Sequence, residues 1–244
     1  MLDEIINGDA YELIKNIPDK SVDLIVTDPP YELGSGGHNT GIFKTRRKGN
    51  TYDEITANGL DKGIDAKRIL PELKRVMKRT NIYLWCNKDQ IKPYLDFFLG
   101  CNFEVIIWGK SNPPPFVGGH YLKDKEYCLY FWEQGVKNHI TCERGRTVYM
   151  SKTNVEDKKS YGHPTIKPLP IIENLILNSS DQGGVVLDPF SGSGTTCVAA
   201  KELGRHYIGF EIDRRYWEIS QSRLAGAKEI RKEGDSVIEQ MSLF

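Results

Sequence analysis

Short apolar runs alternate along the chain with stretches in which apolar residues recur three and four positions apart. The runs are rich in Val, Ile, Leu and aromatic residues, and they predict buried strands at 22–27, 81–85, 104–108, 126–131, 184–187 and 207–210. The wider spacing predicts helices at 10–17, 67–77, 90–99, 168–178, 195–203 and 216–231. This alternation is typical of an α/β fold with a doubly wound, mainly parallel sheet.

Two long stretches follow neither pattern. Residues 32–58 hold many glycines and a basic run, and residues 111–162, apart from the run at 126–131, mix prolines with charges. Loops of this length in a compact domain are usually functional. Because the sequence shows no repeat and no interdomain linker, we expect one domain over residues 1–244 that carries two insertions.

Composition limits the class of protein without naming it. Hydrophobic residues make up 39% of the 244 positions, enough for a large core, and 33 basic residues balance 33 acidic ones. The total charge therefore gives no reason to expect a polyanionic partner, and only a local cluster of basic residues could indicate one. The sequence has no apolar run of membrane-spanning length and no signal-peptide pattern, so we expect a cytoplasmic protein. The five cysteines form no CxxC pair, and we expect no metal.

A glycine-rich turn near the C-terminal end is the strongest sign of a ligand. It follows a predicted strand and reads Asp188-Pro189-Phe190-Ser191-Gly192-Ser193-Gly194-Thr195-Thr196. Glu211 ends the next predicted strand, 19 residues after Gly192. This spacing suits an acidic side chain that binds the ribose of a nucleoside cofactor. A strand-to-helix turn without a ligand is the alternative.

The charge of this turn indicates which cofactor fits. The turn lacks the lysine of a phosphate-binding P-loop, which disfavours ATP. Cys197 stands where a dinucleotide fingerprint has its third glycine, and Asp188 would repel a pyrophosphate, so NAD and FAD are also disfavoured. S-adenosylmethionine has a ribose, no phosphate, and a sulfonium and an ammonium that Asp188 would attract. We interpret the turn as a site for this cofactor.

A second motif, Asp28-Pro29-Pro30-Tyr31, follows the predicted strand at 22–27. The two prolines fix the backbone and remove two donors, which leaves a stiff turn with carbonyl groups free to accept. The exocyclic amine of adenine or cytosine could donate to Asp28 and to the Pro29 carbonyl while Tyr31 stacks on the base. Alternatively, Asp28 could be an ordinary turn cap.

Together the two motifs resemble those of the amino-group DNA methyltransferases. The order, with the catalytic tetrapeptide before the cofactor turn, is similar to that of the permuted β group, and two further segments at 7–10 and 163–168 are similar to its cofactor-contacting segments. The resemblance implies the catalytic residues Asp28, Pro29, Pro30 and Tyr31. It implies the S-adenosylmethionine-binding residues Asp9, Ala10, Thr165, Lys167, Asp188, Phe190, Ser191, Gly192, Gly194, Thr195, Thr196 and Glu211. Asp9 as a helix cap, and 163–168 as a loop entering a helix, are the alternatives.

The resemblance implies direct in-line transfer of a methyl group to an exocyclic amine of a flipped-out base in duplex DNA. Methylation at cytosine C5 is disfavoured because no cysteine follows a proline. In this family an Asp at the first position of the tetrapeptide goes mostly with adenine N6, so Asp28 favours adenine over cytosine N4. An RNA or small-molecule methyltransferase, or a DNA-binding regulator on an inactive scaffold, would be the other interpretations.

Two basic regions are the candidate DNA contacts. We expect 32–58 to be a mobile DNA-contacting loop and 111–162 to be a small target-recognition insertion. Their candidate contact residues are Lys44, Arg46, Arg47, Lys48, Arg144 and Arg146, and solvated surface is the alternative for the cluster at 44–48. A short recognition region suggests a short DNA site or a homodimer, and a cognate restriction enzyme is a further partner that the resemblance allows.

Overall fold

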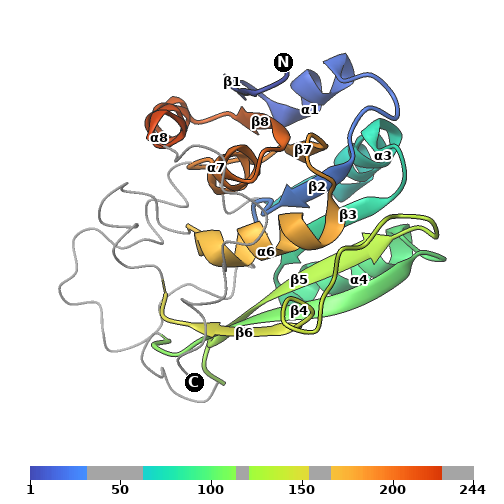
Figure 1. The fold of residues 1–244 in the computed structure, drawn as a ribbon, viewed down its shortest axis with the longest axis vertical. Helices are drawn as coiled ribbons and strands as arrows, with labels where there is room; N and C mark the ends of the chain where they lie inside the picture. The colour runs from blue at the N-terminus through green and yellow to red at the C-terminus, as the bar shows by residue number, and fades with distance from the viewer. Residues whose placement is uncertain (32–62, 114–120, 154–165, 227–244) are drawn as a thin grey trace, which may run out of the picture.

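The computed structural model describes residues 1–31, 63–113, 121–153 and 166–226 (Figure 1). These residues form one sheet flanked by helices. The strands are β1 (Glu4–Asn7), β2 (Leu24–Thr27), β3 (Asn81–Cys86), β4 (Asn102–Lys110), β5 (Lys125–Trp132), β6 (Val148–Ser151), β7 (Val185–Asp188) and β8 (His206–Glu211). The helices are α1 (Ala10–Leu13), the 3-10 helix η1 (Ile14–Asn16), α3 (Ala66–Val76), α4 (Lys88–Phe97), α6 (Leu169–Ser179), α7 (Thr195–Glu202) and α8 (Arg214–Ala225).

The eight strands lie in the order β1-β8-β7-β2-β3-β5-β4-β6. Every described pairing is parallel except those of β5, which runs antiparallel to both β3 and β4. The predicted α/β fold with a mainly parallel sheet is therefore confirmed. The reversal of β5 has a consequence for the site, because its first residues lie at the edge where the other strands end.

Helices cover both faces of the sheet (Figure 1). On one face, α1, η1, α3 and α4 bury Ile14, Leu73 and Phe98 against Ile25 and Leu84. On the other face, a second apolar cluster joins α6, α7 and α8 to the sheet through residues such as Leu175, Val198 and Leu224. Two covered faces explain why the central strands are apolar at successive positions rather than at alternate ones.

The sequence pattern missed the two outer strands and misjudged one helix. β1 and β6 each bury only one residue, Ile5 and Tyr149, so neither gives an apolar run. The helix expected at 10–17 is a single α-helical turn that continues as the 3-10 helix η1. Both β5 and β6 lie within the range 111–162, and the structure describes residues 111–113 and 121–153 of that range.

The carboxyl ends of β7 and β2 lie side by side at a point where the chain leaves the sheet in two directions. β7 leads into α7 on one face, and the next described helix after β2 is α3 on the opposite face. In open α/β sheets, ligands bind at such switch points. None of the helices in the described ranges has the length and apolarity that a membrane span requires.

Candidate active site

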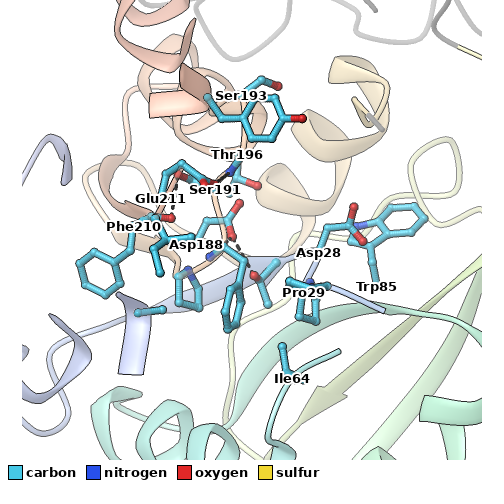
Figure 2. A pocket seen from close by; sticks show the side chains of 18 of the residues that line it. Asp28, Pro29, Ile64, Trp85, Asp188, Ser191, Ser193, Thr196, Phe210 and Glu211 are labelled. Atoms are coloured by element: carbon cyan, nitrogen blue, oxygen red, sulfur yellow. Dashed lines mark hydrogen bonds between the residues drawn. The ribbon is translucent and has the colours of Figure 1, made fainter. Parts of the chain in front are cut away.

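A cavity of about 370 Å³ opens at this switch point, a volume within the range of small-molecule sites. Its walls come from the residues that follow β1, β2, β7 and β8, from the segment just before α6, and from Trp85 of β3. Figure 2 shows Asp28 and Trp85 on one side of the cavity, Glu211 and Phe210 on the other, and Asp188 between them. The two sequence motifs therefore share one cavity.

The tetrapeptide Asp28–Tyr31 forms a turn at the end of β2 that hydrogen bonds hold in place. Tyr31 Oη donates to Asp28 Oδ1 at 2.5 Å. The Pro30 carbonyl accepts from Gln90 Nε2 at 3.4 Å, and Gln90 is itself part of the capping box that begins α4. The turn is therefore tied to α4 as well as to the sheet, and Asp28, Pro29, Pro30 and Tyr31 all line the cavity.

Asp28 belongs to a line of alternating charges. Its Oδ2 pairs with the ammonium of Lys167, which also lies 2.9 Å from Glu126 Oε2. Glu126 in turn pairs with Lys110 at 2.6 Å. Burial raises the pKa of Asp28, although Lys167 opposes this effect. Burial also acts to raise the pKa of Glu126, but Lys167 and Lys110 outweigh it and lower that pKa to about 2.

Lys167 lies on the Asp28 side of the cavity. Its ammonium contacts two carboxylates and lies 5.2 Å from the centre of the Trp85 ring. Burial disfavours its charge, but the two carboxylates outweigh burial and raise the pKa of Lys167. Its positive charge is therefore balanced by protein groups, which reduces its repulsion of a cationic ligand in the same cavity.

Two buried carboxyl groups, Asp188 and Glu211, line the opposite half of the cavity. Asp188 Oδ1 accepts from Thr27 Oγ1 at 2.7 Å and from the Phe190 backbone at 3.1 Å, and burial raises the pKa of Asp188 to about 6. Glu211 accepts from the backbone N–H groups of Gly192 and Asp213, both at 2.8 Å. Burial, opposed by these two bonds, raises the pKa of Glu211 to about 7.

The glycine turn is held in place by its backbone and by α8. Gly192 and Gly194 have φ angles of 51° and 80°, a region that L side chains rarely adopt. A Cβ on Gly194 would lie 2.9 Å from Ser220 Cβ, so the turn packs directly on α8. Arg223 of α8 donates to Ser193 and to Thr195 Oγ1 at 2.8–2.9 Å. These contacts leave Ser191, Gly192, Thr195 and Thr196 along the cavity wall.

The segment after β1 also reaches the cavity. Asp9 caps α1 by accepting from the Tyr11 backbone at 2.9 Å, as the alternative interpretation expects, and it lines the cavity as well. Ala10 is buried beside it, and the Tyr11 ring contacts the Phe190 ring edge-on at 6.4 Å between centroids. Asp9, Ala10 and Phe190 therefore lie together at the cavity wall next to the glycine turn.

Three candidate residues in the described part of the chain do not line the cavity, namely Gly194, Arg144 and Arg146. Arg144 donates to the His139 carbonyl at 2.8 Å, and its own carbonyl accepts from Asn174 and Asn178 in the last turns of α6. Because the first turn of α6 borders the cavity, Arg144 lies toward the far end of the helix. Arg146 follows on the exposed surface. Thr165 and the basic residues Lys44, Arg46, Arg47 and Lys48 lie outside the described residues.

Sequence reasoning missed several residues, among them Glu126 and Trp85, which line the cavity, and Arg223, which holds the glycine turn. Glu126 is the first position of a predicted strand, and a carboxylate at the start of an otherwise apolar run could have marked it as a candidate. Its position at the cavity could not be recognised without knowing that β5 is antiparallel to its neighbours. Trp85 is completely buried in β3, where a sequence pattern marks it only as core. Arg223 is one of many helix-surface arginines by pattern alone.

The residues present fit S-adenosylmethionine. Glu211 is a buried carboxyl group with the acceptor capacity that two ribose hydroxyls require, and its raised pKa indicates that a cationic or hydrogen-bond-donating ligand would favour its charged form. Asp188 is a second buried carboxyl group that a sulfonium or ammonium would stabilise. The wall between them presents small residues and backbone rather than cationic side chains, which suits a ligand without phosphate.

Comparison with known proteins agrees with this arrangement. A family model described as DNA methylase matches residues 22–222. The type II methyltransferase M.HinfI of Haemophilus influenzae is 32% identical over 93% of this chain and 69% of its own length. The fold is similar to that of the M1.HpyAVI–SAM complex, with a TM-score of 0.64, 24% identity and coverage of 91% of this chain and 98% of that one. It is also similar to that of PvuII DNA methyltransferase (cytosine-N4-specific), with a TM-score of 0.66, 16% identity and coverage of 96% and 88%.

The matched range includes the tetrapeptide after β2, the glycine turn after β7 and Glu211, which are the elements that meet in the cavity. The chain belongs to the amino-group DNA methyltransferase family, whose methyl donor is S-adenosylmethionine.

Proposed function

We propose that the protein methylates the exocyclic N6 of adenine in duplex DNA. The observation that carries this proposal is Asp28, a carboxylate at the first position of the tetrapeptide, which lies at the wall of the cavity. A carboxylate and the adjacent Pro29 carbonyl are two acceptors suited to the two hydrogens of an exocyclic amine. Asp rather than Ser at this position favours adenine within the family.

In the proposed reaction the protein acts mainly by placing and polarising the amine. S-adenosylmethionine, when bound, supplies an electrophilic methyl group on a sulfonium. Asp28 and the Pro29 carbonyl accept from the amine and orient its lone pair, while the Tyr31 ring stacks on the base. Asp188 and Glu211 hold the cofactor end of the cavity. The amine nitrogen would form a bond to the methyl carbon as the carbon–sulfur bond breaks, the thioether would leave, and the amine would lose one proton to solvent, so no side chain of the protein needs to form a covalent bond.

A base within a duplex cannot enter a cavity at the strand ends, so the proposal requires base flipping and a grip on the DNA backbone. We propose that Lys44, Arg46, Arg47 and Lys48 contribute to that grip, because four cations in five residues follow the catalytic tetrapeptide closely in the chain.

The structure supports a DNA contact by Arg144 less strongly, since its guanidinium contacts the His139 carbonyl and it lies toward the far end of α6. A cognate restriction enzyme is proposed as a partner because M.HinfI is named a type II methyltransferase.

Product identity tests the proposal. Purified protein is incubated with S-adenosylmethionine carrying a deuterated methyl group and with unmethylated plasmid DNA, and the nucleosides are analysed by mass spectrometry. We expect labelled N6-methyladenine. The Asp28→Ala variant serves as the control for a contaminating methyltransferase, because it shares the purification but lacks the proposed acceptor.

Cytosine N4 is the second candidate, favoured by one finding: the fold is similar to that of a cytosine-N4-specific enzyme. The two amines present the same pair of hydrogens, so the same site could act on either. Labelled N4-methylcytosine without N6-methyladenine would overturn the adenine assignment and leave the roles of Asp28 and Glu211 unchanged.

A further inference from the structure

The Lys167 ammonium lies between two carboxylates that come from different strand ends. Asp28 follows β2, and Glu126 is the second residue of the reversed strand β5. Both pairs are at ion-pair distance, and Lys167 is only 7% exposed. A single buried cation therefore has two alternative acceptors.

Asp28 has both of its carboxylate oxygens engaged in the structure. Oδ1 accepts from Tyr31 Oη, and Oδ2 accepts from Lys167 Nζ. Each oxygen can accept a second hydrogen bond, so an exocyclic amine can bind beside these donors, but the positive charge of Lys167 at Oδ2 weakens Asp28 as an acceptor and repels the amine hydrogens. Because a buried ammonium without an acceptor is costly, Lys167 can weaken its contact with Asp28 only if another carboxylate holds it.

Glu126 meets this requirement. Its Oε1 is fixed by Lys110 of β4 at 2.6 Å, while Oε2 faces Lys167. Its pKa is lowered to about 2 by Lys167 and Lys110 despite burial, so Glu126 stays charged at any working pH. The Lys110 contact also anchors it to the sheet, so Glu126 is a stationary acceptor rather than a mobile one.

We propose that Glu126 is a positioning residue for methyl transfer, which retains the Lys167 ammonium while Asp28 accepts the amine of the target base. Lys167 keeps one carboxylate partner throughout, and Asp28 is freed without leaving a buried charge unpaired. No bond is made or broken by Glu126 itself. The arrangement serves adenine and cytosine amines equally, so it does not depend on which base is methylated.

The proposal predicts a change in pH dependence because Glu126 also acts on Asp28 through space. The ionisable groups that influence Asp28 or are influenced by it are Lys167, Glu126, Tyr31, Cys86, Tyr94, Cys128 and Asp188. Among them Glu126 contributes a like charge, which raises the pKa of Asp28. Removing that charge lowers the pKa of Asp28 and leaves Lys167 to pair with Asp28 alone.

The test is Glu126→Gln, which keeps the size of the side chain and removes its charge. We expect the single-turnover rate of methyl transfer to plasmid DNA to fall by roughly 10-fold to 100-fold, since Lys167 would then pair with Asp28 alone and weaken it as an acceptor for the amine. In a plot of the rate against pH, the fall in rate at acidic pH (the acid limb) should move to lower pH. The dissociation constant of S-adenosylmethionine, measured by calorimetry, should stay within about threefold of the wild-type value.

Glu133→Gln is the matched control. Glu133 directly follows β5 but lies at its other end, where it accepts from Thr80. This variant should keep the wild-type rate and acid limb. Glu126→Asp, which retains the charge, should keep the wild-type acid limb even if its shorter side chain lowers the rate, and it remains informative if Glu126→Gln folds poorly.

A Glu126→Gln enzyme with the wild-type rate would overturn the inference. So would a slow variant whose acid limb coincides with that of the wild type, because a purely structural loss lowers the rate without moving a titration. The identity of the methylated base, which tests the proposed function, does not enter this comparison, so the two proposals fail separately.

Discussion

At the scale of single residues, the site depends on carboxyl groups that burial has made costly to ionise. Asp28, Asp188 and Glu211 all have raised pKa values, and burial is the largest cause for each. Functional groups of enzymes often have shifted pKa values for this reason. A positively charged cofactor or an amine that donates hydrogen bonds would stabilise the buried negative charge of such a carboxylate.

Replacing Asp28 by Ala should separate chemistry from binding. The variant loses the acceptor for the base amine, so we expect methyl transfer to fall by at least about 100-fold. Affinity for S-adenosylmethionine should stay within several-fold, because Glu211 and Asp188 are unchanged and Lys167 keeps Glu126. Single-turnover transfer and calorimetry measure the two quantities.

The control for this substitution is Asp96→Ala, which removes an exposed carboxylate from α4. It should behave as wild type in both measurements. Near-normal turnover of Asp28→Ala would show that the amine acceptor has been assigned to the wrong residue.

The raised pKa of Glu211 predicts how cofactor affinity depends on pH. Below its pKa of about 7 the carboxyl group is protonated, and the cofactor, which favours the carboxylate, must displace a proton to bind. Affinity should therefore be highest well above pH 7 and fall by about fourfold between pH 8 and pH 6.5, because the charged fraction of a group with a pKa of about 7 falls by that factor. Calorimetry between pH 6.5 and about 8 measures this slope in a window above the pKa of about 6 of Asp188.

Glu211→Gln provides the comparison. It cannot ionise, so its affinity should be lower than that of the wild type at pH 8 and nearly independent of pH across the window. An equally steep slope in Glu211→Gln would assign the titration to a different group.

At the scale of elements, the site is made where strands end and helices begin. The sequence placed both motifs correctly, because a buried strand followed by Pro or Gly is a local pattern. The ends of α3, α4, α6 and α7 were predictable within two residues, and Asn87 caps α4 with its side chain. The helix predicted at 216–231 is α8, which ends at Ala225, and residues 227–231 lie outside the described residues. The short outer strands were not predictable, since a strand that buries one residue gives no periodic signal.

The turn between β7 and α7 should tolerate no side chain at Gly194. Alanine there would have to adopt a φ of 80°, and its Cβ would meet Ser220 and Ile5 at 2.9–3.0 Å. We expect Gly194→Ala to lower the free energy of unfolding by about 2–4 kcal/mol and to weaken cofactor binding. Urea unfolding and calorimetry measure these effects.

Gly183→Ala is the matched control, because Gly183 has a similar φ of 74° but nothing within 4 Å of an added Cβ. It should lose only the backbone contribution, about 1 kcal/mol, and bind the cofactor normally. Equal losses in the two variants would mean that close packing on α8 adds nothing to the rigidity of the turn.

At the scale of the whole molecule, the sheet brings together groups that are far apart in the chain. Thr27 and Asp188 are 161 residues apart and share a hydrogen bond, because β2 and β7 are neighbours. Lys167 and Asp28 are 139 residues apart. The resemblance of the motifs indicated that these segments cooperate, but the particular partners follow from strand order.

The sequence by itself determined the α/β class, the two motifs and the chemical types of the reacting groups, since each depends on residues close together in the chain. Only the tertiary structure decided that β5 is reversed, that Glu126 therefore shares Lys167 with Asp28, and that Arg144 lies toward the far end of α6. The physical reason is that strand direction and strand neighbours are set by backbone pairing between distant segments. An apolar run has the same composition whichever way it is paired.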